Sequence, residues 1–232
     1  IPYLRKIPLA SRLNQTFQVP VTVLNDGDAA GLAEARIGNL QDCDCGATFV
    51  LGTGVGLALT SNGSLISNWH LKDYLRWPSL GEKQVSPEQK QYQTEILRHG
   101  ISSLVQNLGS AVNFVAKASH LLELPEEDGV QVFEVLEAGH HEELQELFTS
   151  YCREIAILIY NLQSLVRLEK VTIGGGISSQ PLLLGEINRQ YKSLMEESGE
   201  QRFSLVEIQA ARYHNSSNLL GAVCHFNILE NN

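Results

Sequence analysis

Three short glycine-bearing motifs in a fixed order constrain the fold of this chain more than any other feature of its sequence. They are Asn-Asp-Gly-Asp at 25–28, Leu-Gly-Thr-Gly-Val-Gly at 51–56 and Gly-Gly-Gly-Ile-Ser at 174–178. Each follows an apolar segment that is predicted to be a β-strand, and open α/β sheets bind their ligands where strands end. Together the motifs predict a nucleotide site with a catalytic acidic residue beside it.

The segments around the motifs indicate strands that alternate with helices. Apolar and β-branched runs predict strands at 19–24, 48–51, 57–60, 170–173 and 203–208, with a hairpin turn at Asn62-Gly63. Periodicity and composition predict helices at 29–36, 91–122, 130–138, 144–168, 181–195 and 216–226, the first with Asp28 as its N-cap. This alternation is typical of the α/β fold class.

Residues 52–56 are suited to binding phosphate. Small residues let backbone N–H groups approach an anion closely, and Thr53 adds a hydroxyl group. The alternative interpretation is a tight turn in a β-hairpin. No Gly-Lys-Ser/Thr follows, so the motif is not a Walker A loop, and the strand predicted after it excludes a dinucleotide-binding fingerprint.

Asp26 is the candidate catalytic carboxylate. A carboxylate at the end of a strand can point into a cleft and accept a hydroxyl proton as the oxygen attacks a γ-phosphate. The alternative role for this residue is an Asx-turn or a helix cap.

With these three motifs the chain resembles the ROK family, which comprises sugar kinases and sugar-responsive repressors of the actin-like ATPase superfamily. The resemblance runs from about Ile1 to about Phe226 and includes the tail at 213–222. It implies a two-domain actin-like, ribonuclease H-like α/β fold. The implied division is a remnant of the small N-terminal domain at 1–45, a large α/β domain at 46–212 and a closing helix at 213–232 that returns towards the small domain.

The resemblance also implies roles for the motif residues. Asp26 would be the general base that activates a sugar hydroxyl, and Asn25 would hydrogen-bond the sugar. The implied nucleotide contacts are Gly52, Thr53 and Gly54 with the ATP phosphates, and Gly174, Gly175 and Gly176 with adenosine. ATP and Mg²⁺ would be required, and the substrate would be a hexose or an N-acetylhexosamine. Relatives often dimerise, so the resemblance leaves both a monomer and a homodimer as alternatives.

The sequence departs from the family pattern in two ligand-binding segments. The family opens with an Asp-x-Gly-Gly-Thr phosphate loop that this sequence does not contain, so we expect an N-terminally incomplete chain. The family also has a Gly-Glu-x-Gly-His segment that meets the sugar, and residues 67–83 retain only Gly81-Glu82 of it. His70 and Glu82 are candidate sugar contacts, with ordinary loop or packing roles as the alternative. Asp28 stands where the family more often has Asn.

Cys43-Asp44-Cys45-Gly46 resembles part of the zinc loop that many family members have. Two cysteines alone cannot complete a tetrahedral site. We therefore predict no structural zinc and assign no metal ligands.

Composition limits the classes of molecule that this protein is expected to bind. The net charge of −9 argues against a general nucleic-acid or anionic-membrane surface. The four cysteines show no secreted disulfide pattern, and no membrane span or signal peptide is visible. We expect a cytoplasmic protein with a small-molecule sugar and ATP as its partners.

Three function classes follow. The first is a ROK-type sugar kinase, which Asp26 and the two glycine motifs favour. The second is the non-catalytic sugar-sensing domain of a ROK-type transcriptional repressor, which the two altered segments favour. A degenerate scaffold remnant is the third.

Overall fold

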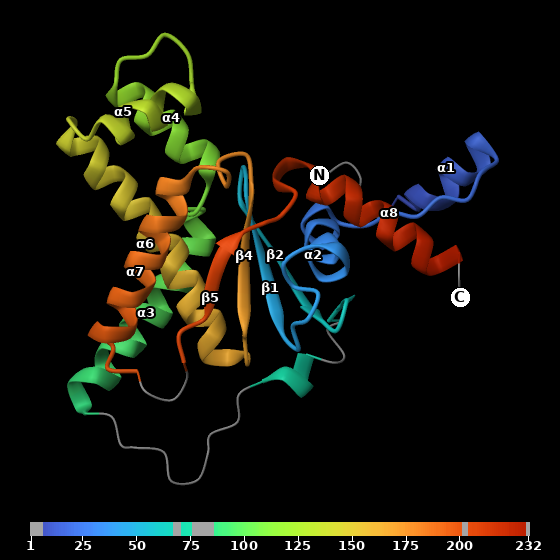
Figure 1. The fold of residues 1–232 in the computed structure, drawn as a ribbon, viewed down its shortest axis with the longest axis horizontal. Helices are drawn as coiled ribbons and strands as arrows, with labels where there is room; N and C mark the ends of the chain where they lie inside the picture. The colour runs from blue at the N-terminus through green and yellow to red at the C-terminus, as the bar shows by residue number, and fades with distance from the viewer. Residues whose placement is uncertain (1–6, 67–70, 76–85, 201–203, 231–232) are drawn as a thin grey trace.

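The computed structural model describes residues 7–66, 71–75, 86–200 and 204–230. A five-stranded mixed sheet with the order β3-β2-β1-β4-β5 lies between two layers of helices (Figure 1). The strands are β1 (Gly46–Leu51), β2 (Val55–Ser61), β3 (Ser64–Leu65), β4 (Lys170–Gly175) and β5 (Glu207–Ala210). Strand β1 pairs antiparallel with β2 and parallel with β4. The outer pairs are antiparallel for β2 and β3 and parallel for β4 and β5.

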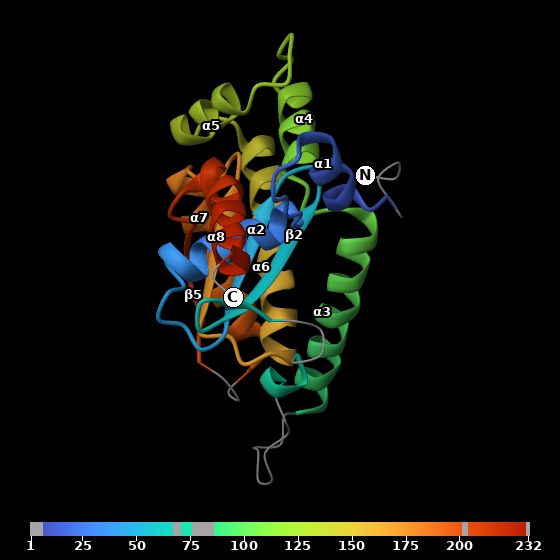
Figure 2. The ribbon, with the colours of Figure 1, turned by 90° about the vertical axis from the view of Figure 1, so that its right-hand side faces the viewer.

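Helices cover both faces of the sheet. Helices α3, α6 and α7 lie on one face, and α2 and α8 lie on the other (Figures 1 and 2). The bounds are α1 (Leu9–Phe17), α2 (Asp26–Ile37), α3 (Pro87–Gln106), α4 (Ala111–Leu121), α5 (Gly129–Ala138), α6 (Glu142–Leu165), α7 (Pro181–Glu197) and α8 (Ser217–Glu230). None of the described helices is long and apolar enough to cross a membrane.

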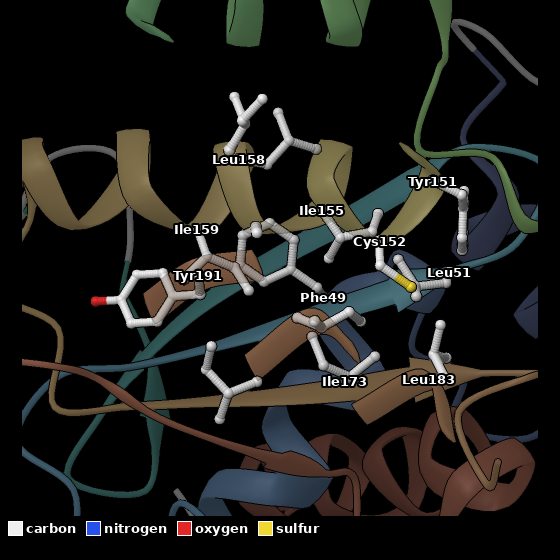
Figure 3. Packing of buried hydrophobic residues seen from close by; sticks show 14 of the residues in the cluster. Phe49, Leu51, Tyr151, Cys152, Ile155, Leu158, Ile159, Ile173, Leu183 and Tyr191 are labelled. Carbon is white, nitrogen blue, oxygen red and sulfur yellow. The ribbon is translucent and has the colours of Figure 1, made fainter. Parts of the chain in front are cut away.

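The main hydrophobic core lies between the sheet and helices α6 and α7. Phe49 and Ile173 from the central strands pack towards Ile155 and Ile159 of α6 and Tyr191 of α7, and all five side chains are buried (Figure 3). The alternate residues Thr48 and Thr172 are also fully buried, and their hydroxyl groups form a hydrogen bond of 2.9 Å between β1 and β4. The central strands are therefore buried on both faces, as parallel strands usually are.

Helix α2 packs closely on both the sheet and α8. A methyl group placed on Gly31 would lie 2.4 Å from Ala58 Cβ in β2. A methyl group placed on Gly221 of α8 would lie 1.7 Å from the carbonyl oxygen of Ala29. These distances are shorter than any van der Waals contact, so the two glycines allow the backbones to approach.

A buried carboxylate joins the end of α2 to the segment that precedes α8. Glu34 is fully buried, and its two oxygens accept the backbone amides of Asn39 (3.0 Å) and Arg212 (2.9 Å). The amide of Tyr213 also hydrogen-bonds this carboxylate. Burial raises the pKa of Glu34, although these amides and the nearby Arg212 charge act in the opposite direction.

Most of the predicted elements are confirmed, since β1, β2 and β4 contain the predicted strands. The Asn62-Gly63 hairpin is also present, with positive φ values of 48° and 77°. The strand predicted at 19–24 is wrong: these residues form no ladder, because no described strand lies beside them to pair with. The helix predicted at 91–122 is broken at 107–110. The late strand predicted at 203–208 is displaced, since β5 overlaps this range only at 207–208 and continues to Ala210. The predicted domain division stays a prediction.

The contact between α2 and α8 generates a prediction about stability. Gly221→Ala should lower the free energy of unfolding by about 1–3 kcal/mol, because the added methyl group forces the two helices apart. Gly185→Ala in α7 is the matched control: its methyl group meets nothing within 4 Å, and it should raise stability by up to about 1 kcal/mol. Urea unfolding followed by circular dichroism measures both, and equal effects would contradict the packing described.

Glu34 gives a second prediction. Glu34→Ala should lower the free energy of unfolding by about 3 kcal/mol, because it leaves buried backbone amides without an acceptor. The control Glu137→Ala, on the exposed side of α5, should leave this free energy nearly unchanged. Since folding raises the pKa of Glu34, the folded protein holds this proton to a higher pH than the unfolded chain, and the contribution of Glu34 to stability falls as pH rises through the folded-state pKa. The loss measured by urea unfolding should therefore be larger at pH 5 than at pH 7.5.

Candidate functional site

The two glycine motifs that follow strands meet at one end of β1. Leu51, the last residue of β1, pairs with Val55 of β2 and with Gly175 of β4. Residues 52–54 and 174–176 therefore lie side by side at the carboxyl end of two parallel strands, as the sequence predicts. This edge is where open α/β sheets bind ligands.

The Asn-Asp-Gly-Asp motif forms the beginning of α2 and does not follow a strand. Asn25 is the N-cap of the helix, and its Oδ1 accepts the amides of Gly27 (3.0 Å) and Asp28 (3.3 Å). The prediction that Asp28 is the N-cap is therefore wrong, and the helix begins at Asp26. The Oδ1 of Asn25 therefore accepts two of the four backbone N–H groups that the first turn of a helix leaves without a partner.

Asp26 lies beside the hairpin of the second motif. A methyl group placed on its neighbour Gly27 would be 3.7 Å from Gly56 Cα in β2, so the beginning of α2 rests on the start of this strand. The Asp26 side chain is exposed, and its Oδ1 accepts the Gly27 amide at 2.9 Å. Burial, and then the charge of Asp26, raise the pKa of the half-buried Asp28.

Residues 52–54 form the turn of the β1–β2 hairpin, so the alternative interpretation of this motif is correct as a description of its shape. The Gly52 amide donates to the Gly54 carbonyl oxygen (3.0 Å). The Gly52 carbonyl oxygen accepts from Ser110 Oγ (3.3 Å), and the Thr53 carbonyl oxygen accepts from Asn107 Nδ2 (2.6 Å). In the described part of the chain no acceptor is found for the amides of Thr53 and Gly54. A turn with two available amides is still suited to an anion.

The three glycines at the end of β4 have different surroundings. Gly175 has a φ of 104°, and a methyl group on it would lie 2.1 Å from the Leu51 carbonyl oxygen, so only glycine fits there. A methyl group on Gly176 would meet nothing within 4 Å. Ser178 closes the turn by donating its Oγ to the Gly175 carbonyl oxygen at 2.8 Å. The fold therefore requires Gly175, while Gly176 borders open space.

Two predicted sugar contacts cannot be placed, since His70 and Glu82 lie outside the described residues. Cys43 and Cys45 are buried, and burial raises the pKa of the Cys43 thiol to about 12. Among the residues that the structure describes, no group of three or more His, Cys, Asp or Glu side chains could hold a metal ion.

Asn107 contacts the hairpin turn, although none of the sequence motifs includes it. It lies in the break between α3 and α4, with a left-handed φ of 56°. Asn followed by Gly109 and Ser110 is a helix stop and start signal that could have indicated this break. A cavity of about 190 Å³ between α3, α4 and α6 is lined in part by Asn107 but by no motif residue. It is smaller than most small-molecule sites, so we do not assign it to the substrate.

Comparison with known proteins shows a family match. The model of the ROK family matches residues 2–70 and 98–227. Curated relatives include the β-glucoside kinases of Listeria monocytogenes, 29% identical over 210 residues, and of Listeria innocua, 28% identical over 217 residues. Each match covers 90% of this chain, and the chain spans only 65% of the length of each of these relatives.

Solved structures share the fold. A ROK family protein from Streptococcus pneumoniae in complex with sucrose superimposes with a TM-score of 0.70 at 23% identity, over 99% of this chain and 73% of that protein. A ROK family glucokinase from Streptomyces griseus in complex with glucose and AMPPNP gives a TM-score of 0.64 at 21% identity, over 95% and 72%. The fold is therefore the actin-like ATPase fold of these proteins, which confirms the predicted fold class.

The different surroundings of Gly175 and Gly176 lead to a prediction. Gly175→Ala should lower the free energy of unfolding by about 3 kcal/mol, because the methyl group overlaps β1 and the φ is unfavourable for alanine. Gly176→Ala should change it by no more than about 0.5 kcal/mol. Urea unfolding of the pair tests this, and similar losses for both variants would contradict the different surroundings of the two glycines.

Proposed function

The chain belongs to the ROK family, and from this we propose that it acts as a sugar kinase, which transfers the γ-phosphate of ATP to a hydroxyl group of a hexose or an N-acetylhexosamine. The observation that carries the proposal is the convergence of an exposed carboxylate and two glycine turns at one end of β1. The β-glucoside kinases and the glucokinase bound to glucose and AMPPNP support sugar and ATP as the reactants.

Asp26 is proposed as the general base. Its carboxylate is exposed at the first residue of α2. Oδ1 accepts the Gly27 amide, and within the described chain no donor is found for Oδ2. Oδ2 can therefore accept the proton of a sugar hydroxyl while the hydroxyl oxygen attacks the γ-phosphate.

Asn25 is proposed to bind the sugar beside this base. Its Oδ1 is engaged in capping α2, and the described residues supply no acceptor for its Nδ2. Nδ2 is therefore available to donate to a sugar hydroxyl oxygen. The cap fixes the side chain in place before the sugar arrives, which lowers the entropy cost of binding.

The two glycine turns are proposed to bind ATP. The available amides of Thr53 and Gly54 would donate to phosphate oxygens, with the Thr53 hydroxyl as a further donor. Adenosine would lie against Gly174 and Gly176, where the open space next to Gly176 gives it room. Mg²⁺ would neutralise charge on the phosphates, and because it binds mainly through phosphate oxygens and water, a dedicated cage of carboxylates is not required.

The second candidate is a sugar-sensing domain of a ROK-type repressor, which would bind sugar through Asn25 without transferring phosphate. The observation that favours it is residues 67–83, which lack the Gly-His of the family's sugar-binding segment. Phosphorylation of a sugar by the protein would exclude this candidate.

Asp26→Asn in the full-length protein should lower kcat by about 10²–10⁴-fold, because an amide cannot accept the hydroxyl proton. Asp28→Asn removes the same charge two residues away, at a position where the family more often has Asn, and should leave kcat within a fewfold of the wild type. A coupled ADP-release assay over a panel of hexoses measures both, with thermal unfolding as the control for folding. An Asp26→Asn variant with undiminished kcat would remove Asp26 from this role.

A further inference from the structure

The turn at 52–54 is held from one side by the junction between α3 and α4. Asn107 Nδ2 donates to the Thr53 carbonyl oxygen at 2.6 Å. The Gly52 carbonyl oxygen accepts both Ser110 Oγ and the Val112 amide, each at 3.3 Å. The carbonyl groups of Gly52 and Thr53 therefore point towards this junction.

The direction of the carbonyl groups fixes the direction of the amides. In a trans peptide the C=O of one residue and the N–H of the next point in opposite directions, and every described peptide bond is trans. The N–H groups of Thr53 and Gly54 therefore both point away from the α3–α4 junction. Two neighbouring amides that point the same way form an anion-binding concavity.

Glycine makes this arrangement easy to lose. Gly52 and Gly54 flank Thr53, and glycine adopts positive and negative φ values with similar ease. The peptide between Thr53 and Gly54 can therefore rotate at low cost unless a partner holds it. A rotated peptide would present its carbonyl oxygen, instead of its N–H, to a phosphate, and that contact is repulsive.

We infer that Asn107 is a positioning residue that holds the Thr53–Gly54 peptide in its phosphate-binding orientation. The inference rests on the proposed function, since it concerns the ATP phosphates. Asn107 does not contact the nucleotide in this account; it acts through the Thr53 carbonyl group. Its side chain also packs on the turn, because a methyl group on Gly54 would lie 3.2 Å from Asn107 Oδ1.

Asn107 can be tested without disturbing the helices. It ends α3 with a left-handed φ of 56°, and glycine adopts this conformation at no cost, so Asn107→Gly removes only the side chain. Ser110 is less suitable because its hydroxyl also caps α4 by accepting the Asn113 amide at 3.1 Å. Asn62→Gly is the matched control, since Asn62 has a φ of 48° in the turn at the other end of β2.

The first experiment compares steady-state kinetics of the full-length protein and its variants. Asn107→Gly should raise the KM for ATP about tenfold, the effect of one lost hydrogen bond, and leave the KM for the sugar unchanged. Asn107→Asp should raise it further, because a carboxylate oxygen opposite the Thr53 carbonyl oxygen repels it. Asn62→Gly should match the wild type. An Asn107→Gly variant with a wild-type KM for ATP, or with equal losses for ATP and sugar, would overturn the inference.

A second measurement separates this inference from the proposed function. The Gly52 amide donates to the Gly54 carbonyl oxygen across the turn, so its hydrogen–deuterium exchange in the unliganded protein should be faster in Asn107→Gly than in the wild type or Asn62→Gly, since the turn is no longer held. Unchanged exchange would overturn the inference even if ATP is a substrate. Failure of the wild-type protein to bind AMPPNP in calorimetry would instead overturn the proposed function, and the phosphate role of Asn107 with it.

Discussion

Helix α2 packs against the sheet and α8 at such short distances that the contact points have room only for backbone atoms or a methyl group. Gly31 faces Ala58 of β2, and Gly221 of α8 faces the carbonyl oxygen of Ala29, at separations that exclude any larger side chain. Such contacts give little side-chain burial for each residue, but they fix the distance between elements closely. The position of Asp26 at the start of α2 depends on this packing, because the helix cannot shift along the sheet without a clash.

The same kind of contact brings the motifs together. Gly27 rests on Gly56, and Gly175 lies against the carbonyl oxygen of Leu51, so the beginning of α2, the β1–β2 hairpin and the end of β4 meet through their backbones. Backbone contacts of this kind are rigid, since no rotamer can change to relieve them. The proposed base and the proposed phosphate-binding turn are consequently held by the fold itself, and only the short segment at 52–54 needs a side chain to fix its conformation.

Local patterns in the sequence were sufficient to predict the strands β1, β2 and β4 and the edge at which two motifs meet. They failed where the outcome depends on distant partners. Residues 19–24 have strand-like composition, but a strand forms only beside another strand, and none of the described strands lies there. Local sequence also does not predict the role of Glu34, because its partner Arg212 is 178 positions away in the sequence. The break at Asn107, in contrast, was signalled locally by Asn, Gly and Ser and was overlooked in favour of the longer apolar period.

The donors to Glu34 are main-chain amides of residues 39, 212 and 213. Every amino acid except proline has such an amide, so these three contacts with Glu34 do not depend on which side chains stand at positions 39, 212 and 213. The side chains present there add hydrogen bonds of their own, from Asn39 to the Ala210 carbonyl oxygen and from Arg212 and Tyr213 to the Ile37 carbonyl oxygen. Position 34 has no such freedom, because aspartate is too short and glutamine would turn an NH₂ group towards an N–H. A single acidic residue can therefore preserve the main-chain part of this junction while the side chains around it diverge.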